Sequence, residues 1–341
     1  FHKMQFIQFS VPASASGVCP IEVTVGDATS NSLAFTVRPG QIYYVKPDTM
    51  NGDDGNAGSF ASPWATLAPA VAAMQPGDIT YVFAVSLANS ETAINGKVGT
   101  AAQPFSLLAY PGHTPDLSFS PTNRRPPIWN FSYSSRFWNV SRFRLRSDEP
   151  AIDPFDGGRT IGNEVTDVAC AVNGAAAIYG AFGNPTGLTI LGNTIHDYGC
   201  VVAENGAGPS SNQTHTTYFS NRHNNGENGC ASWSATPACV NGPIEFGWNY
   251  LYDNEARQGV HFYDENNAGG WGQSVHLVHD NVIVNQVGPG LDITLSANPG
   301  WNTDLNVAFV NNLLINNGLR DSQDVIYPVV SLQGSFIDNN A

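Results

Sequence analysis

Three short segments carry side chains whose types and spacing could do acid–base chemistry. They align without gaps and are His215–Ser220, Gln258–Tyr263 and Pro289–Thr294. If they are neighbouring parallel strands, the alternation of side chains places Tyr218, His261 and Asp292 in one outward column. Such strands lie about 4.8 Å apart, so His261 and Asp292 would touch. The sequence therefore predicts a histidine–carboxylate pair on the outer surface of a sheet.

The residues around this pair could supply the rest of a proton-abstraction site. Removing the C5 proton of a uronic acid takes a group that neutralises the sugar carboxylate, a base, and a proton donor for the leaving oxygen. We expect His261 to be the base or acid, Asp292 to orient it or hold a cation, and Arg257 to meet the sugar carboxylate. Tyr218 or Tyr263 would serve the leaving group. Further residues could bind the substrate, and they are Asp264, Glu265, Arg222, His223 and, for stacking on sugar rings, Trp271 and Trp301.

Two other interpretations of this column stay open. Asp264 or Glu265 could pair with Asp292 as the two carboxyl groups of a glycosidase. Alternatively, His261 and Asp292 could form an ordinary surface pair, which contributes little to stability.

Two other stretches contain the residue types of metal ligands. The loop with Asp48, Asp53 and Asp54 is rich in oxygen ligands, as calcium requires, but it lacks the spacing of an EF-hand and its closing Glu. Turn formation explains the same residues, so calcium is the one cofactor that the sequence suggests and turns are the interpretation we favour. His276 and His279 form a His-x-x-His pair without a third assured ligand, which favours a structural role.

A repeat along the chain indicates how these strands are positioned. The pattern apolar-x-x-Asn-x-apolar-x-Asp/Asn occurs four times, around Asn193, Asn249, Asn281 and Asn312, and these asparagines are 56, 32 and 31 residues apart. Short strands punctuated by Asn and Gly at this period predict a parallel β-helix. We expect the four asparagines to occupy left-handed corners and to stack as a hydrogen-bonded ladder. The first gap is about two periods long, which predicts one disguised rung within it.

Composition limits the partners of the chain. Only 12% of its 341 residues are charged, and 14 Lys and Arg face 28 Asp and Glu, a formal net charge of −14. This acidic balance argues against nucleic acid and anionic membranes as partners. No apolar run approaches the ~20 residues of a membrane span, and no signal peptide is visible.

The stretch from residue 42 to 85 resembles the start of many right-handed parallel β-helix proteins of the pectate-lyase-like superfamily. The shared features are a strand, a Gly/Asp/Asn loop, S-P-W-x-T-L, a short helix and P-G-D before the next strand. Thr66 would cap a helix that runs to about Gln75 and that places Leu67, Ala70, Val71 and Met74 on one face. We expect this helix to close the end of the solenoid.

The first 40 residues resemble the last strands of an immunoglobulin-like TIG module. The resemblance rests on I-Q-F-S-V-P and P-I-E-V-T-V-G-D-A-T-S-N-S-L-A-F-T-V. A whole sandwich of this kind takes roughly 80–100 residues. We therefore expect either a fragment or a module completed by a neighbouring chain through strand addition, which would give head-to-tail self-association.

Basic residues also cluster before residue 150. Arg142, Arg144 and Arg146 alternate, which predicts that they share one face of a strand and could meet an acidic polysaccharide. We favour structural pairing with nearby carboxylates, which are Asp148, Glu149 and Asp153.

The sequence thus predicts an all-β chain with a partial TIG module at residues 1–40 and a right-handed parallel β-helix at residues 41–341. The resemblance implies an extracellular or cell-surface protein that binds or cleaves a polysaccharide, with β-elimination favoured over hydrolysis. The alternative is a non-catalytic structural or adhesive surface protein, since fold alone does not decide function.

The five cysteines lead to a testable prediction. Cys230 and Cys239 lie nine residues apart in a polar stretch, which suits a local disulfide in an oxidising compartment, while Cys170 and Cys200 are one rung apart and could stack either bonded or reduced. An odd count leaves at least one thiol without a partner in the chain. Peptide mapping of unreduced protein from its native source should recover Cys230 and Cys239 in one linked peptide. Recovery of both as free thiols would exclude the bridge.

Overall fold

The computed structural model describes most of the chain. The described residues are 11–12, 15–84, 86–88, 92–94, 96–118, 128–129, 135–147, 150–152, 156–167, 176–180, 187–199, 214–220, 242–256, 258–264, 274–295, 305–318, 330–332 and 335–339. No helix within these ranges is both long and apolar enough to cross a membrane.

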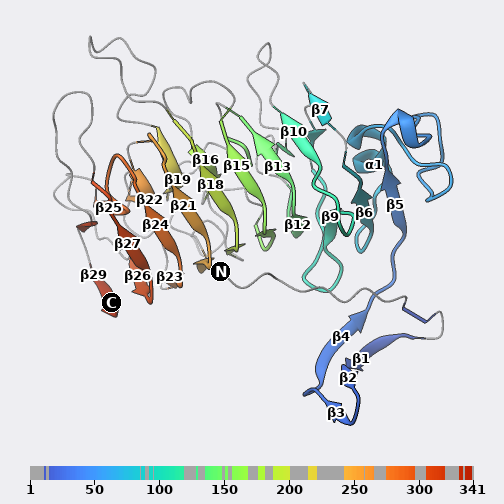
Figure 1. Cartoon of the computed structure of the whole chain (residues 1–341), viewed down its shortest axis with the longest axis horizontal. Coiled ribbons are helices and arrows are strands. Elements are labelled where there is room, and N and C mark those ends of the chain that lie inside the picture. Colours follow the sequence, from blue (N-terminus) through green and yellow to red (C-terminus); the bar gives the residue numbers. More distant parts are fainter. Residues whose placement is uncertain are drawn as a thin grey trace.

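The chain winds as a right-handed parallel β-helix whose rungs lie side by side along the molecule (Figure 1). One parallel sheet has ten strands, which are β5 (Ile42–Val45), β6 (Ile79–Val82), β9 (Phe105–Ala109), β12 (Trp138–Ser141), β14 (Arg159–Ile161), β17 (Leu188–Leu191), β20 (Ile244–Gly247), β23 (Val275–His279), β26 (Asn306–Val310) and β29 (Ser335–Asn339). A second has eight, which are β7 (Ser86–Ala88), β10 (Asp116–Ser118), β13 (Arg144–Arg146), β15 (Glu164–Thr166), β18 (Thr194–His196), β21 (Tyr250–Tyr252), β24 (Val282–Val284) and β27 (Leu313–Ile315).

The third sheet holds the segments that the sequence aligned. Its five strands are β16 (Ala176–Gly180), β19 (His215–Ser220), β22 (Gln258–Asp264), β25 (Leu291–Leu295) and β28 (Val330–Leu332). The short strands β8 (Thr92–Ala93) and β11 (Ile128–Trp129) pair with each other in the earlier rungs.

Apolar side chains stack from rung to rung inside the solenoid. One such stack is fully buried and consists of Leu145, Val165, Ile195, Leu251 and Ile283. In strands this short only one side chain can point inward, so each three-residue strand contributes one core residue and two outward residues.

The predicted asparagine ladder is confirmed. Asn249 Oδ1 accepts from Asn193 N at 2.9 Å and from Asn193 Nδ2 at 3.0 Å, and the same pattern links Asn249 to Asn281 and Asn281 to Asn312. Asn163 extends the ladder by one rung, because its own backbone N–H donates to Asn193 Oδ1. The sequence pattern missed Asn163 because the apolar position three residues earlier is Thr160.

The expectation that these asparagines adopt the left-handed conformation is wrong. Positive φ occurs one residue before each ladder asparagine, at Gly162, Gly192, Trp248, Asp280 and Asn311, and in the preceding rung at Arg142, before Phe143. The left-handed residue makes the bend, and the asparagine after it turns its amide inward, where it meets the backbone of the adjacent rungs. A second set of left-handed residues follows the eight-stranded sheet and consists of Asp197, Asp253, Asn285 and Asn316.

The expectation of a disguised rung between Asn193 and Asn249 is also wrong. β17 pairs directly with β20, and β18 pairs directly with β21. The extra length is therefore inserted into a single rung, on either side of β19.

A second buried ladder, which the sequence pattern did not reveal, lines the next corner. Asn254 Oδ1 accepts from Tyr198 N at 3.0 Å, and Asn317 Oδ1 accepts from Gln286 N at 3.1 Å. Asn254 Nδ2 donates to Ile195 O, and Asn317 Nδ2 donates to Ile283 O. Both corners of the eight-stranded sheet are therefore held by buried amides.

The predicted capping helix is present as α1 (Leu67–Ala73), and it buries Leu67, Ala70 and Val71. Thr66 is the N-cap residue, but its side chain does not cap the helix; its hydroxyl donates instead to Asp54 Oδ2 at 2.7 Å. The ammonium of Lys97 caps the other end, donating to Ala72 O and Met74 O.

The N-terminal strands are antiparallel and largely exposed. β1 (Gly17–Ile21) pairs with β4 (Leu33–Val37), and β2 (Thr24–Val25) pairs with β3 (Ala28–Thr29). They project from the solenoid in Figure 1. The TIG resemblance and the domain boundary at residue 40 stay predictions.

The ladder should carry a measurable share of the stability. In Asn249→Ala, the buried Asn193 N–H and Ile190 C=O both lose a partner. Each buried polar group left without a partner costs about 1–3 kcal/mol, so we expect a loss of about 3 kcal/mol in the free energy of unfolding, measured by urea denaturation.

A matched control separates this effect from the loss of any amide. Asn285 makes solvent-facing amide contacts with Asp253 and Asn316 and has a φ of 54°. Asn285→Gly keeps that conformation accessible, so its loss should stay below about 1 kcal/mol. Equal losses in the two variants would contradict a special role for the buried ladder.

Candidate functional site

The strand register bears out the alignment made from the sequence. Tyr218, His261 and Asp292 are successive partners across β19, β22 and β25, and Tyr263 is the partner of Thr294. Phe219 and Phe262 lie in the core, so the column is on the outer face of the sheet. The catalytic and binding roles given to these residues stay proposals.

His261 is held at both ring nitrogens. Its Nε2 lies 3.4 Å from Thr294 Oγ1 and 3.6 Å from Asp292 Oδ2, and its Nδ1 lies 3.2 Å from His215 Nδ1. Thr294 Oγ1 in turn donates to Asp292 Oδ1 at 3.1 Å. We call His215, His261, Asp292 and Thr294, together with Tyr218 and Tyr263, the histidine column.

These contacts assign the protons of the two histidines. Because the Thr294 hydroxyl donates to Asp292, it accepts from His261, which places the His261 proton on Nε2. His261 Nδ1 is then an acceptor, so His215 Nδ1 is the donor. With its proton on Nδ1, a neutral His215 ring carries its lone pair on Nε2.

His215 is the residue that sequence reasoning missed. Strict alternation places it on the inner face with Thr217 and Phe219, yet its ring lies 4.7 Å from those of Tyr218 and His261, measured between centroids. Alternation is interrupted at Thr216, whose buried hydroxyl donates to Gln286 Oε1 inside the solenoid at 3.0 Å. Two adjacent threonines before an aromatic pair are a weak signal of such an interruption.

The column is not the exposed surface that the sequence predicted. His261 is 5% exposed and Asp292 is 6% exposed, and His215 and Tyr218 are equally buried. Tyr263 and Thr294 are partly exposed and form its rim. The interpretation as an ordinary surface ion pair therefore fails, because this pair is desolvated.

Burial sets the protonation of His261. It holds the pKa of the imidazole well below its usual value, and the neighbouring His215 lowers that pKa further. Desolvation disfavours the charged form of a histidine, so His261 is neutral at pH 7.

Several residues assigned from the sequence lie outside the described residues. They are Arg257, Glu265, Arg222, His223, Trp271 and Trp301, together with the cysteines Cys170, Cys200, Cys230 and Cys239. Asp264 ends β22 as the partner of Leu295. Among the cysteines, Cys19 is described, and it is a free thiol.

Two carboxylates of the expected calcium loop accept backbone hydrogen bonds within the fold. Asp53 Oδ1 accepts from Gly55 N at 2.7 Å, and Asp54 Oδ1 accepts from Ala65 N and Thr66 N. Asp48 begins a short 3-10 helix, Asp48–Met50. In the described part of the chain, no three His, Cys, Asp or Glu side chains are grouped to hold a metal. The Asp53 contact is of the turn type that the sequence interpretation favoured.

His276 and His279 have separate structural surroundings. His276 is fully buried and its Nδ1 accepts from Ile244 N at 3.2 Å. His279 Nδ1 lies 2.8 Å from Asp280 Oδ2, and its Nε2 lies 3.5 Å from Glu245 Oε1.

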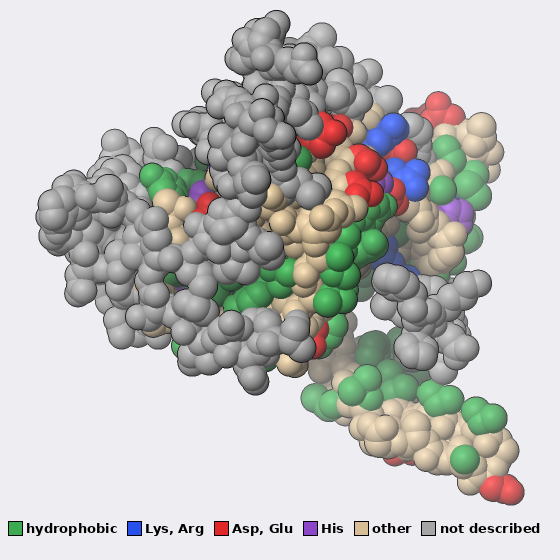
Figure 2. Space-filling view, turned by 60° about the vertical axis from the view of Figure 1, so that its left-hand side comes forward, with side chains coloured by type: hydrophobic (Ala, Val, Ile, Leu, Met, Phe, Trp, Pro, Cys, Tyr) green, Lys and Arg blue, Asp and Glu red, His purple; other side chains and the backbone are tan. Residues whose placement is uncertain are grey.

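Two arginines of the predicted cluster pair with carboxylates of neighbouring rungs. Arg144 contacts Glu164 and Arg146 contacts Asp116, both at 3.0 Å, and Figure 2 shows basic side chains next to acidic ones on this surface. The expectation that Arg142 shares their strand face is wrong, because its φ of 69° places it in the corner before β13. Asp148, Glu149 and Asp153 lie outside the described residues.

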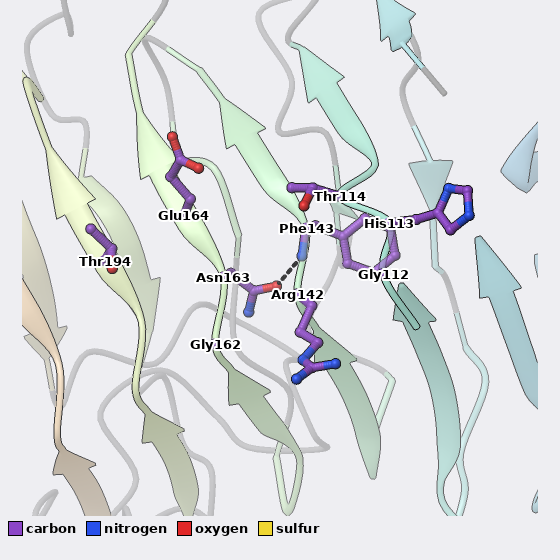
Figure 3. Close-up of a pocket in the computed structure, with 9 residues that line it drawn as sticks. All are labelled: Gly112, His113, Thr114, Arg142, Phe143, Gly162, Asn163, Glu164 and Thr194. Atoms are coloured by element: carbon purple, nitrogen blue, oxygen red, sulfur yellow. Dashed lines mark hydrogen bonds between the residues drawn. The ribbon is translucent and has the colours of Figure 1, made fainter. Parts of the chain in front are cut away.

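A cleft of about 430 Å³ lies beside this corner (Figure 3). It is lined by Gly112, His113, Thr114, Arg142, Phe143, Gly162, Asn163, Glu164 and Thr194. Glu164 is already paired with Arg144, and Asn163 accepts from Phe143 N as part of the ladder. The ring of His113 points away from the other labelled side chains and packs on Phe83. The cleft therefore offers few polar groups that are not already engaged in the fold.

Comparisons with known proteins find matches among solved structures and none among sequences. No protein-family model matches the chain, and no curated protein matches it. Among solved structures, pectate lyase Pel9A matches at 14% identity with a TM-score of 0.45, over 82% of this chain and 66% of its own length. A rhamnogalacturonan lyase matches at 14% identity and a TM-score of 0.31, over 84% of this chain and 90% of the lyase. An alginate lyase from Paenibacillus sp. str. FPU-7 matches at 13% identity and a TM-score of 0.34, over 88% of this chain and 99% of the lyase.

This chain thus spans about two thirds of the length of pectate lyase Pel9A. The assignment as a parallel β-helix rests on the strand ladders of the chain itself.

The buried His276 leads to a prediction about pH. Burial lowers its pKa from 6.5 to about 4. The folded protein keeps this ring neutral while the unfolded chain takes up a proton below pH 6.5. The free energy of unfolding should therefore fall as the pH drops from about 6.5 to about 4, by about 3 kcal/mol from this residue.

His276→Gln keeps an acceptor near Ile244 N but does not titrate. Urea denaturation of both proteins over this pH range isolates the contribution, since the carboxylates titrate in both. Parallel pH profiles would show that His276 is not the source.

Proposed function

We propose that this chain is an extracellular polysaccharide lyase that cleaves an acidic polysaccharide by β-elimination at the histidine column. The observation that supports it best is the chain of contacts from Asp292 through His261 to His215. A buried carboxylate, two histidines and two tyrosines on the outer face of a sheet are groups that proton abstraction and return require.

The contacts favour His215 as the base. Both nitrogens of His261 are engaged, so His261 acts as a positioning residue: its Nδ1 accepts from His215 and its Nε2 is fixed by Thr294 and Asp292. Neutral imidazoles carry a basic lone pair at pH 7, and burial keeps the pKa of His261 low. The proposal therefore moves the base role from His261 to His215.

Tyr263 suits the role of proton donor. It is on the partly exposed rim, and its ring centroid is 5.6 Å from that of His261 and 6.2 Å from that of Tyr218. In the proposed step, His215 takes the C5 proton of a uronic acid, and the electrons of that bond form the C4–C5 double bond. The C4–O bond then breaks, and the leaving oxygen takes the proton of Tyr263.

The partner for the sugar carboxylate is proposed from the sequence. Arg257 immediately precedes β22 and carries the needed charge. A guanidinium stabilises the negative charge that develops on the substrate as the proton leaves.

The burial of the column favours a second candidate function. Side chains with about one twentieth of their surface exposed meet a polymer less readily than an open groove would. A non-catalytic extracellular protein that binds polysaccharide or adheres to a surface is the function that this observation supports.

A substrate screen with variants decides between these functions. Wild type is incubated with polygalacturonate, alginate and a neutral glucan, and both the ultraviolet absorbance of unsaturated products and new reducing ends are followed. We expect unsaturated product from an acidic polymer. His215→Asn and His261→Asn should each lower the rate by about 10²- to 10⁴-fold.

His279→Asn is the matched control, because His279 is similarly buried next to carboxylates but lies on another sheet. It should keep the wild-type rate, with circular dichroism confirming that all variants are folded. Reducing ends without unsaturated product would replace the lyase with a hydrolase. No cleavage of any polymer by the wild type would leave the non-catalytic function.

A further inference from the structure

A second group of aromatic side chains lies on the outer face of the ten-stranded sheet, at the first rungs. Tyr44 of β5 and Tyr81 of β6 are partners in register, and their neighbours in sequence Val45 and Val82 point into the core. Tyr110 follows β9, and Phe60 comes from the loop before α1. Phe60 is 53% exposed and the three tyrosines are partly exposed. We call these four residues the aromatic patch.

The rings of the aromatic patch form one continuous surface. The ring centroids of Tyr44 and Tyr81 are 6.1 Å apart in a stacked arrangement, and Tyr81 meets Tyr110 edge-on at 5.8 Å. Phe60 joins it at 5.1 Å from Tyr44 and 6.4 Å from Tyr110. The buried Phe83 packs against the patch, and its ring stacks on that of Tyr110 with 4.1 Å between the centroids.

A buried ammonium group lies within this surface. Lys46 Nζ is 3.4 Å from the ring centroid of Phe60 and 4.9 Å from that of Phe83, and it donates to Phe60 O at 2.8 Å. An ammonium has three donors, and no carboxylate of the described residues forms an ion pair with Lys46. In a protein of net charge −14, this is a local positive charge surrounded by ring faces.

The aromatic patch is held in place before any ligand arrives. Asn56 Nδ2 donates to Asn51 O and Pro63 O, and Trp64 Nε1 donates to Asn56 O, which fixes the loop that carries Phe60. Ligand binding therefore orders few side chains, which lowers the entropic cost of association.

We propose that the aromatic patch is a binding site for an acidic polysaccharide, separate from the histidine column. Sugar rings have apolar C–H faces that pack on aromatic rings, and tyrosines pair an apolar ring with a wet hydroxyl that can bond sugar hydroxyls. The Lys46 charge favours sugars that carry carboxylates. This site takes its ligand class from the proposed function but does not depend on the catalytic step.

The position of the aromatic patch allows it to strengthen polymer binding at the histidine column. It lies at the first rungs of the ten-stranded sheet and the histidine column lies on the five-stranded sheet, so the two sites do not overlap and a long polymer would have to span several rungs to contact both. Binding at a second site on the same polymer raises the effective concentration of chain at the first.

Affinity electrophoresis of the full chain tests the proposal. Native gels contain polygalacturonate, alginate or hydroxyethylcellulose, and the retardation gives a Kd for each polymer. We expect an acidic polymer to retard the wild type, and Tyr44→Ala/Tyr81→Ala to bind it about tenfold or more weakly, from the loss of two aromatic contacts. Turnover of short oligosaccharides, if the column is catalytic, should not change.

Tyr250→Ala/Tyr252→Ala is the matched control, since these two tyrosines also stack on an outer face, at 4.6 Å, but on the eight-stranded sheet. It should bind as the wild type does, with melting temperatures showing that both double variants are folded. Unchanged binding in Tyr44→Ala/Tyr81→Ala, equal loss in both variants, or no retardation of the wild type would each overturn the proposal. Retardation in polymer-free gels that grows with protein concentration would instead assign the patch to a second copy of the chain.

The test also separates this site from the proposed function. Binding without any cleavage refutes the lyase and keeps the aromatic patch. Cleavage with no effect of the tyrosine variants keeps the lyase and refutes the aromatic patch.

Discussion

The buried amide ladder is the interaction on which the rest of this structure depends. Each rung bends sharply between the ten-stranded and eight-stranded sheets, and a bend leaves backbone N–H and C=O groups facing the interior. Asn193 and Asn249 satisfy these groups with one side chain per rung, and the left-handed residue before each of them makes the bend itself. A buried polar group without a partner is costly, so the ladder fixes where the rungs from Asn163 to Asn312 turn.

Because the turns are fixed, the register between rungs is fixed as well, and equivalent residues stack into columns. The column of Tyr218, His261 and Asp292 is one result. The pairing of Arg144 with Glu164 and of Arg146 with Asp116 is another, and the partners come from neighbouring rungs about 20–30 residues away. In a solenoid, chemistry that needs several side chains is therefore assembled across rungs.

The histidine column combines this stacking with burial. A histidine pair on an open surface would titrate near its ordinary pKa, whereas burial and the neighbouring ring keep His261 neutral. The aromatic patch shows the opposite arrangement, since its rings are partly exposed around an ammonium that is buried. The two surfaces have different proposed tasks: proton transfer for the histidine column and contact with a polymer for the aromatic patch.

The sequence by itself determined the solenoid, the ladder of Asn193, Asn249, Asn281 and Asn312, the capping helix and the alignment of His261 with Asp292. These features follow from the spacing of residue types along the chain, which can be read from the sequence without knowing which strands pair. The tertiary structure decided that the 56 residues between Asn193 and Asn249 make one rung, because only strand pairing shows which rungs are neighbours. It also decided the place of His215, since the alternation of β19 breaks where Thr216 finds an acceptor in Gln286, 70 residues away. The burial of the column was likewise a property of packing around the sheet, which the period of a strand does not encode.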